Sequence, residues 1–202
     1  MSKNQYLAIL SAVLLLGIST GVSAAPETYA LDPHHANINW NANHFGFSNP
    51  SGHFNVSKGT LVLDEAKPEA SKVDVTIDVA GLATGIPEFD KHLKSADFLN
   101  TDKYPTATFK STKVEVTSKE TAKVTGNLTL HGVTKPVTLA MKLNKIAPNP
   151  MTQKKTAGFS GAIVLKRSEF GIDKYVPNIS DEVVIRIEAE ANLVEAVKKA
   201  AK

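Results

Sequence analysis

Apolar and polar residues alternate along most of the chain between positions 37 and 189. Ile38, Trp40 and Ala42 alternate with asparagines, and the same period of two returns in Val73–Val79, Leu128–Leu130, Val137–Leu143, Phe159–Leu165 and Val183–Ala189. A period of two places successive side chains on opposite faces of a β-strand. The pattern predicts about eight antiparallel strands, each with one polar and one apolar face. Before them, Tyr29–Asp32 predicts a short strand that ends in a turn at Pro33.

Two glycines stand where the alternation changes phase. Gly46 follows His44, which falls on the apolar side, and Gly59 separates Phe54 and Val56 from the next apolar pair. Strands with one apolar face can assemble as a sandwich or as a closed barrel. Because glycines at phase changes mark turns and bulges that let a sheet bend and close, the sequence favours an antiparallel barrel.

One segment, Gly85–Phe109, departs from the period of two. Phe89, Leu93 and Ala96 are spaced i, i+4 and i+7, which places them on one side of a short helix. Pro87 suits the first helical position, where its missing N–H has no partner to lose. A helix of about ten residues is marginal alone in water, so its apolar side must pack on the barrel. The segment predicts a short helical lid over one barrel end.

Polar residues border the apolar side of this predicted lid. Asp90 and His92 fall on its two edges, and Asp90 is spaced for an ion pair with Lys94. Two interpretations stay open: a solvated helix surface, or the polar rim of a binding site. Asp90 beside His92 is also compatible with acid–base chemistry.

The two ends of the chain frame a single domain. Leu7–Ile18 is a short apolar run, and Val22–Ala24 is a small-residue cleavage pattern, so residues 1–25 are expected to be a secretory signal peptide. This predicts export to the periplasm. Residues 26–193 then suffice for one barrel domain, and residues 194–202 form a basic tail. No later stretch is long and apolar enough to span a membrane.

The composition and the motifs of the chain exclude several kinds of catalytic and binding site. The chain has no cysteine, which excludes disulfides and thiol catalysis. Its formal net charge is +3, and its lysines are spread singly, so no nucleic-acid partner is expected. His34 and His35 are adjacent and would point to opposite faces of a strand, so no metal site is expected. No nucleophile elbow and no phosphate-binding glycine loop are present.

The predicted inner face is built mainly of valine, isoleucine, leucine and alanine. Its few bulky members are Trp40, Phe54, Phe109, Met141 and Phe159. Small and β-branched wall residues favour a cavity over a filled core, and a barrel of about eight strands can hold one small ligand. Such a cavity would be apolar, long and narrow, and suited to a hydrocarbon chain.

Three polar residues outside the lid are further candidates. His44 is predicted to point inward, either toward a ligand or toward a backbone carbonyl. Arg167 lies in a strand-end turn, where its planar guanidinium suits either a phosphate or the neighbouring carbonyl groups. His131 is expected mainly to shape its turn beside Gly132.

Five stretches of the chain resemble one known family. They are YALDPHHANINW, HFGFSNPSGHF, DKHLKSADFLNTDKYPTATF, LTLHGVTKPVTL, and RSEFGID with the following SDEVVIRIEAEA. Together they cover nearly all of residues 27–192, and the lid and LTLHGVTKPVTL stretches are long and specific. The chain is similar to the YceI-like proteins, exported lipocalin-like barrels that bind polyisoprenoid or other long-chain lipids.

The resemblance implies a lipocalin-like barrel with an isoprenoid tail inside and a head group near the mouth. No cofactor is implied apart from this bound lipid. One position departs from the family pattern: an arginine usually precedes the lid aspartate, and this chain has Phe89 there. If that arginine holds an anionic head group, this chain holds one less tightly or prefers a neutral head group such as a quinone.

The inward pattern, the lid and the resemblance together give one set of expected ligand-binding residues: Trp40, His44, Phe54, Phe89, Asp90, His92, Leu93, Phe98, Phe109, Met141, Phe159, Arg167 and Phe170. The expected function is a periplasmic binding protein, not an enzyme, that stores or carries an isoprenoid quinone or polyprenyl phosphate. Two alternatives stay open: a secreted enzyme that acts on a lipid head group through Asp90 and His92, and a packed barrel that binds a protein partner. The sequence also leaves open whether the chain forms a homodimer.

Overall fold

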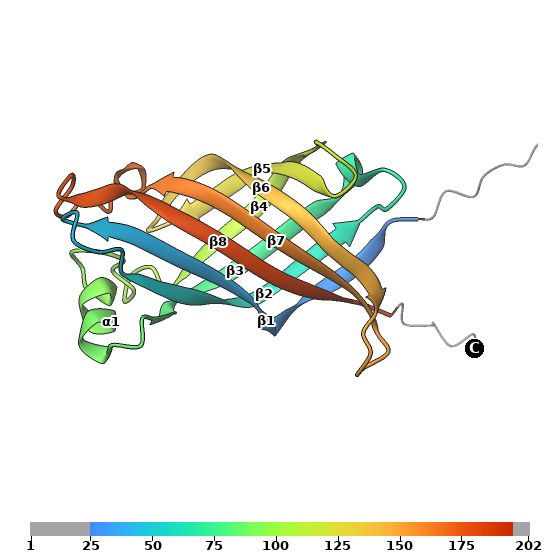
Figure 1. Cartoon of the computed structure of the whole chain (residues 1–202), viewed down its shortest axis with the longest axis horizontal. Helices are drawn as coiled ribbons and strands as arrows, with labels where there is room; N and C mark the ends of the chain where they lie inside the picture. The colour runs from blue at the N-terminus through green and yellow to red at the C-terminus, as the bar shows by residue number, and fades with distance from the viewer. Residues whose placement is uncertain (1–24, 196–202) are drawn as a thin grey trace, which may run out of the picture.

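The computed structural model describes residues 25–195, which form a closed antiparallel barrel of eight strands (Figure 1). Each strand pairs with the next, and the last strand pairs with the first to close the barrel. The strands are β1 (Glu27–His44), β2 (Ser51–Leu63), β3 (Lys72–Ala83), β4 (Thr106–Val116), β5 (Thr121–Leu130), β6 (Val133–Pro148), β7 (Lys155–Lys166) and β8 (Ile179–Leu193). The predicted all-β barrel is therefore confirmed. The predicted signal peptide, except for Ala25, and residues 196–202 of the predicted tail lie outside the described residues.

The alternation of side chains sets the two faces of each strand, and β3 shows this clearly. Val73, Val75, Ile77 and Val79 all face the barrel interior. Between them, Asp74 points outward and forms an ion pair of 2.9 Å with Lys110, its direct neighbour on β4. Burial of the apolar face and solvation of the polar face fix the strand register, because a slip of one residue would exchange the two faces.

Both predicted phase changes correspond to real irregularities. Gly46 lies in the turn between β1 and β2 with φ of 78°, a conformation that glycine adopts without strain. The β2–β3 pairing shifts register between Val56 and Lys58, next to Gly59. This bulge restores the inward direction for the apolar residues that follow, as the sequence pattern requires.

The predicted turn at Pro33 is wrong, because β1 continues through it. The irregularity is instead a register shift between Leu31 and Ala36 in the pairing with β8. The Asp32 carboxylate accepts the His34 backbone N–H at 2.9 Å and lies 3.0 Å from Nδ1 of His35. These local hydrogen bonds replace the missing ladder bonds, so a proline is tolerated inside the strand at this bulge.

A helix, α1 (Pro87–Lys94), lies in the connection between β3 and β4 at one end of the barrel (Figure 1). Its Phe89 ring meets the Trp40 ring edge-on, with centroids 6.5 Å apart. Leu93 packs against a cluster of buried aromatic and aliphatic residues. The predicted helix is thus confirmed, but it is shorter than expected. Ala96 lies beyond its end and is exposed, so it is not part of the apolar side.

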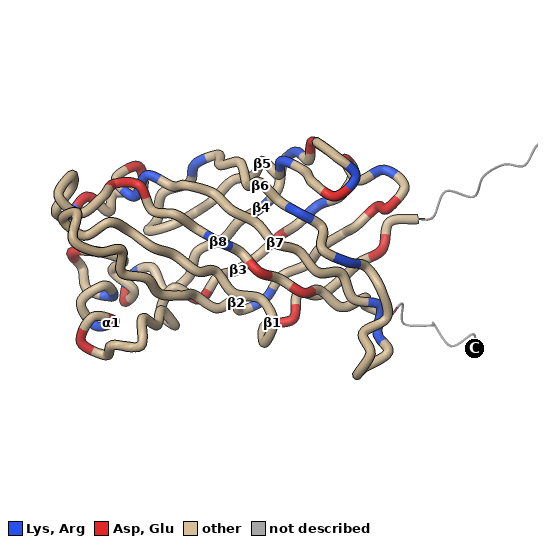
Figure 2. Tube along the Cα trace, in the orientation of Figure 1, with Lys and Arg blue, Asp and Glu red and all other residues tan. Residues whose placement is uncertain are grey.

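Two barrel ends can be distinguished. At the α1 end lie α1, the β1–β2 and β5–β6 turns, and the β7–β8 connection, which contains a 3₁₀ turn (Arg167–Phe170). At the opposite end, called here the terminal end, lie the β2–β3, β4–β5 and β6–β7 loops and both ends of the described chain (Figure 1). Figure 2 shows charged residues of both signs interspersed along the strands and loops. No helix within residues 25–195 is long and apolar enough to cross a membrane.

Candidate functional site

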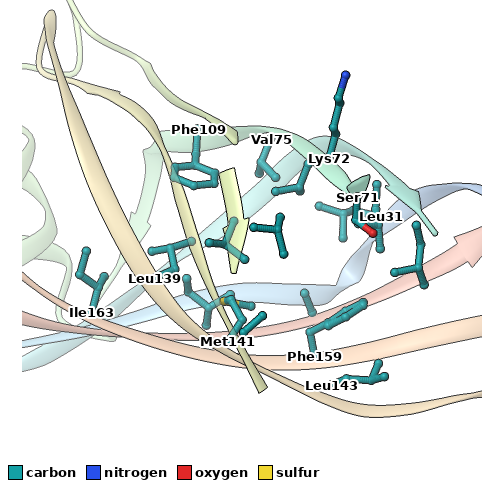
Figure 3. Close-up of a pocket in the computed structure, with 18 of the residues that line it drawn as sticks. Leu31, Ser71, Lys72, Val75, Phe109, Leu139, Met141, Leu143, Phe159 and Ile163 are labelled. Carbon is teal, nitrogen blue, oxygen red and sulfur yellow. The ribbon is translucent and has the colours of Figure 1, made fainter. Parts of the chain in front are cut away.

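The barrel interior contains a large apolar cavity of about 400 Å³ (Figure 3). All eight strands contribute to its wall. Representative wall residues, taken from β1 to β8 in order, are Leu31, Phe54, Val75, Phe109, Val124, Leu139, Met141, Phe159, Ile163 and Ile187. A volume of this size lies within the range of about 300–1,000 Å³ found for small-molecule sites. The interior is therefore an unfilled apolar space, as the small and β-branched wall residues predict.

This large cavity reaches the surface at the terminal end. Exposed residues of the β2–β3 loop, the start of β3 and the β4–β5 loop line it there, namely Glu65, Lys72, Lys119 and Glu120. The Lys72 side chain extends away from the interior in Figure 3. The mouth of the large cavity thus carries both signs of charge, while the wall behind it is hydrocarbon.

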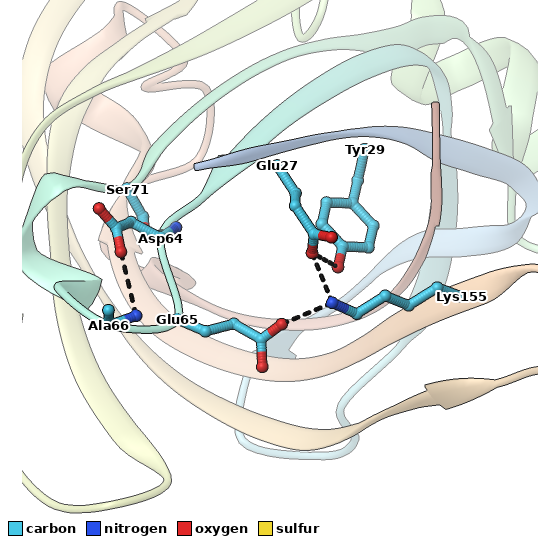
Figure 4. A network of polar contacts seen from close by, with 7 residues as sticks. All are labelled: Glu27, Tyr29, Asp64, Glu65, Ala66, Ser71 and Lys155. Carbon is cyan, nitrogen blue, oxygen red and sulfur yellow. Dashed lines mark hydrogen bonds and ion pairs between the residues drawn. The ribbon is translucent and has the colours of Figure 1, made fainter. Parts of the chain in front are cut away.

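A polar cluster ties the mouth to the start of β1 (Figure 4). Lys155 donates to the carboxylates of Glu27 and Glu65, the latter at 2.7 Å, and Tyr29 donates its hydroxyl proton to Glu27 at 2.8 Å. The hydrogen bond from Lys155 holds the pKa of Glu27 below its ordinary value, and the same bonds raise the pKa of Lys155. Burial, with the bond to Glu27, raises the pKa of Tyr29. This cluster, the Lys155 latch, joins β1, β7 and the β2–β3 loop.

Asp64 holds the same loop from within. Its buried carboxylate accepts the backbone N–H groups of Ala66 at 3.0 Å and Lys67 at 2.8 Å, and its own N–H donates to the Ser71 hydroxyl. A carboxylate that accepts successive backbone N–H groups fixes a turn. The lip of the mouth that carries Glu65 is therefore a defined turn.

A second cavity of about 220 Å³ lies under α1. Phe54, Leu130, Leu165 and Ile185 line both cavities, so the two adjoin inside the barrel. The small cavity and the large cavity together extend from the α1 end to the mouth at the terminal end, and the two are called here the passage.

Arg167 is a buried cation in the wall of the small cavity. Its guanidinium donates three hydrogen bonds to backbone carbonyl oxygens: those of Ile172 (2.9 Å), Ile179 (3.0 Å) and Ser180 (2.9 Å). The alternative in which this arginine binds neighbouring carbonyl groups is therefore observed. Burial lowers the pKa of the guanidinium, against the opposing field of the nearby aspartates.

Three aromatic or heteroaromatic residues complete the polar lining of the small cavity. The indole Nε1 of Trp40 is buried and has no hydrogen-bond acceptor among the described residues. His44 lines the small cavity but is exposed, so its predicted inward position holds only in part. His92 is likewise exposed, and its ring contacts Phe98 edge-on with centroids 4.7 Å apart.

Asp90 has a different place from the one expected. It lines neither cavity, and its carboxylate accepts both the backbone N–H (2.7 Å) and the hydroxyl (2.6 Å) of Thr84. These bonds from Thr84 lower the pKa of the carboxyl group. Within the described chain, no ion pair of Asp90 with Lys94 and no hydrogen bond with His92 is formed. Asp90 therefore fastens α1 to the end of β3.

The structure brings twelve of the thirteen expected ligand-binding residues to the passage, with Asp90 the exception. The expected set omitted most aliphatic wall residues, such as Val75, Leu139 and Ile163. Their signal was present in the strand alternation, which assigns them to the inner face. That alternation does not separate a cavity wall from a filled core.

His131 supports the wall from outside the passage. It adopts φ of 52° in the turn before Gly132, and its Nδ1 lies 3.0 Å from the carbonyl oxygen of Phe170. The predicted turn-shaping position of His131 is thus observed. No group of three histidine, cysteine, aspartate or glutamate residues in the described part of the chain is placed to hold a metal ion.

Comparisons with known proteins agree with this architecture. The chain matches the YceI-like domain over residues 29–191. A UPF0312 protein of Azotobacter vinelandii is 41% identical over 192 residues, which cover 94% of this chain and 98% of the relative. The solved YCEI protein of Campylobacter jejuni is 35% identical, with a TM-score of 0.66 over 76% of this chain and 90% of that protein.

A more distant solved structure shares the fold. It is a polyisoprenoid binding domain from Saccharophagus degradans, described as implicated in plant cell wall breakdown. Its TM-score is 0.63 over 82% of this chain and 98% of that domain, at 14% sequence identity. This likeness concerns the fold alone.

Proposed function

The chain belongs to the YceI-like domain family, and on that premise we propose that it binds an isoprenoid lipid in the apolar passage of its barrel. The observation that carries the proposal is the passage itself, two adjoining cavities of about 400 and 220 Å³ with hydrocarbon walls. Native interiors leave few voids larger than a water molecule. A passage of this size is therefore a binding site rather than imperfect packing.

The ligand class follows from the shape and the wall chemistry. The passage consists of two adjoining apolar cavities, with polar groups only at its two ends. A hydrocarbon chain gains about 0.8 kcal/mol for each methylene removed from water, less the free energy required to order it. A domain that shares this fold is described as polyisoprenoid-binding, and the isoprenoid tail is proposed by analogy with it.

The proposed role is storage or transport in the periplasm, not catalysis. The apolar run and the small-residue cleavage pattern at the N-terminus support export. An isoprenoid lipid cannot cross an aqueous compartment alone, because its tail is insoluble. Enclosing the tail in the barrel leaves a soluble complex that can diffuse between membranes.

Native mass spectrometry of the full chain, expressed with export and purified without detergent, tests the proposal. We expect a complex that is heavier than the mature chain by one lipid, and organic extraction should release an isoprenoid quinone or a polyprenyl compound. The proposal fails if the purified protein carries no lipid and also takes up none when incubated with geranylgeraniol. A bound lipid without an isoprenoid tail would refute the ligand class and leave lipid binding in place.

A further inference from the structure

The buried polar groups of the small cavity are all hydrogen-bond donors. A guanidinium has five N–H groups, and three of those on Arg167 donate to backbone carbonyl groups, which leaves two. The indole of Trp40 can only donate, and its buried Nε1 has no acceptor within the described chain. Buried donors without acceptors are unfavourable, so the small cavity is complementary to a group that accepts hydrogen bonds.

The charge of Arg167 has no carboxylate in direct contact, although Asp173 and Asp181 lie near enough for their charges to favour the cation. Its three carbonyl partners orient the guanidinium but carry no net charge. The nearby Asp181 carboxylate accepts the N–H and the hydroxyl of Ser168, both at 2.8 Å. No carboxylate of residues 25–195 forms an ion pair with Arg167. A buried cation with no carboxylate in contact is stabilised by each further acceptor oxygen that reaches it.

We infer that the small cavity binds the lipid head group, and that this head group presents only acceptor oxygens to Arg167 and Trp40. A quinone carbonyl and a phosphate are two sources of such oxygens. The tail then lies in the large cavity and points toward the mouth at the terminal end. This inference rests on the proposed function and adds to it the orientation of the lipid and the chemistry of its head group.

The geometry separates this orientation from the opposite one. Trp40 lies on β1 in the small cavity, and Glu27 at the start of the same strand belongs to the Lys155 latch at the other end. Trp40 stands thirteen positions after Glu27, which corresponds to roughly 40 Å along the strand at about 3.3 Å per residue. A head group at the terminal mouth would therefore lie far from Trp40.

The chain contains a single tryptophan, so its emission reports on the small cavity alone. We would titrate the delipidated full chain with decylubiquinone, whose quinone ring quenches tryptophan emission on contact, and with dodecane, which has no head group. Calorimetry would establish binding of each probe independently. We expect decylubiquinone to remove at least half of the emission at saturation, and dodecane to leave its intensity unchanged. Calorimetric binding of decylubiquinone without quenching would overturn the inference and leave lipid binding intact.

Two variants test the donors themselves. In Arg167→Met, we expect affinity for both decylubiquinone and farnesyl phosphate to fall about tenfold, or about 1.4 kcal/mol, with dodecane unaffected. A larger loss for farnesyl phosphate would identify charge as the dominant attraction, and equal losses would identify hydrogen bonding. Phe159→Leu, in the wall of the large cavity, is the control and should weaken all three probes similarly.

The outcomes distinguish failure of the head-group inference from failure of the proposed lipid binding. If Arg167→Met weakens dodecane as much as the two probes with head groups, the arginine acts only through structure and the inference fails. If Arg167→Met does not fold, because it leaves three carbonyl groups without donors, the quenching result on the unmodified chain still decides. If none of the three probes binds the unmodified chain, the proposed function itself fails.

Discussion

Filling the large cavity with a side chain tests whether its volume is what holds the lipid. Ala189 on β8 lines the large cavity, beside Phe159 on β7. In Ala189→Phe, the added ring would project into a space of about 400 Å³. Val164→Phe is the matched control, because Val164 lies on the outer face of β7 and is 53% exposed. The two variants place the same phenyl ring on opposite sides of the barrel wall.

The size of the effect follows from the hydrocarbon that the ring displaces. A phenyl ring takes the room of about one isoprenoid unit, which has five carbon atoms. At about 0.8 kcal/mol for each buried methylene, the loss reaches roughly 4 kcal/mol, or about a thousandfold in the dissociation constant. Val164→Phe should change the dissociation constant less than threefold.

The thermal stability of Ala189→Phe provides an independent test of whether the large cavity is empty. If the space is empty in the lipid-free protein, Ala189→Phe should leave Tm unchanged or raise it slightly. In a core already filled, the same change would cost about 1–3 kcal/mol by overpacking, which lowers Tm by about 2–4 °C per kcal/mol. Calorimetric titration with geranylgeraniol and differential scanning calorimetry make both measurements. Unchanged affinity together with a lowered Tm would refute the account of the large cavity.

Three further predictions concern the lid and the mouth. Leu93→Asp should detach α1 and speed lipid release five- to thirtyfold, since a partly buried leucine contributes about 1–2 kcal/mol. Stopped-flow transfer of the lipid to vesicles measures the release rate, and an unchanged rate would mean that α1 is no lid. Asp90→Ala should lower Tm more than Asp90→Asn, which keeps an acceptor for Thr84. Neither variant should change lipid affinity at equilibrium, and a loss of lipid affinity in both would show that Asp90 contributes to lipid binding. Glu27 has a lowered pKa, so its contribution is present above its ordinary value of 4.5 and is lost as the pH falls through the lowered pKa. Lys155 has a raised pKa, so its contribution to stability is present below pH 10.5 and is lost as the pH rises through the raised pKa. The Tm difference between the unmodified chain and Lys155→Met should therefore shrink at both low and high pH. A Tm difference independent of pH would contradict the assigned role of the latch.

The barrel was predictable because one signal, the period of two, repeats in every strand. Val73–Val79 shows why this works: each apolar residue faces the interior, so burial and register enforce the same pattern. The helix was predictable for a similar reason, since Phe89 and Leu93 both pack inward. Its end was not, because the backbone becomes extended at Ser95, and the carbonyl groups of Leu93 and Lys94 accept hydrogen bonds from Leu99 and Thr101 instead of from a further helical turn.

The errors fall where a side chain had more than one compatible partner. Asp32 and Pro33 form a typical turn pair, but pairing with β2 and β8 on either side carries the strand through them. Asp90 was spaced for Lys94 along the helix, yet Thr84 from the preceding loop supplies two donors, at 2.7 and 2.6 Å. Local sequence contains no information on which partner the folded chain brings near.

The candidate site was predictable residue by residue but not as a shape. The parity of the strands assigned Phe54, Phe109 and Phe159 to the interior, and all three line the large cavity. Whether these rings meet or leave a space depends on barrel radius and strand tilt, which are properties of the closed sheet. The buried donors of Trp40 and Arg167 likewise emerge only when the β1 and β7–β8 segments come together.

The most direct test of the passage is a crystal structure of the full chain loaded with geranylgeraniol. We expect continuous electron density for the chain through both cavities, past Phe54 and Leu130, with no other bound copy in the barrel. Density confined to the outer wall, or cavities left empty at a saturating concentration of the lipid, would contradict the account.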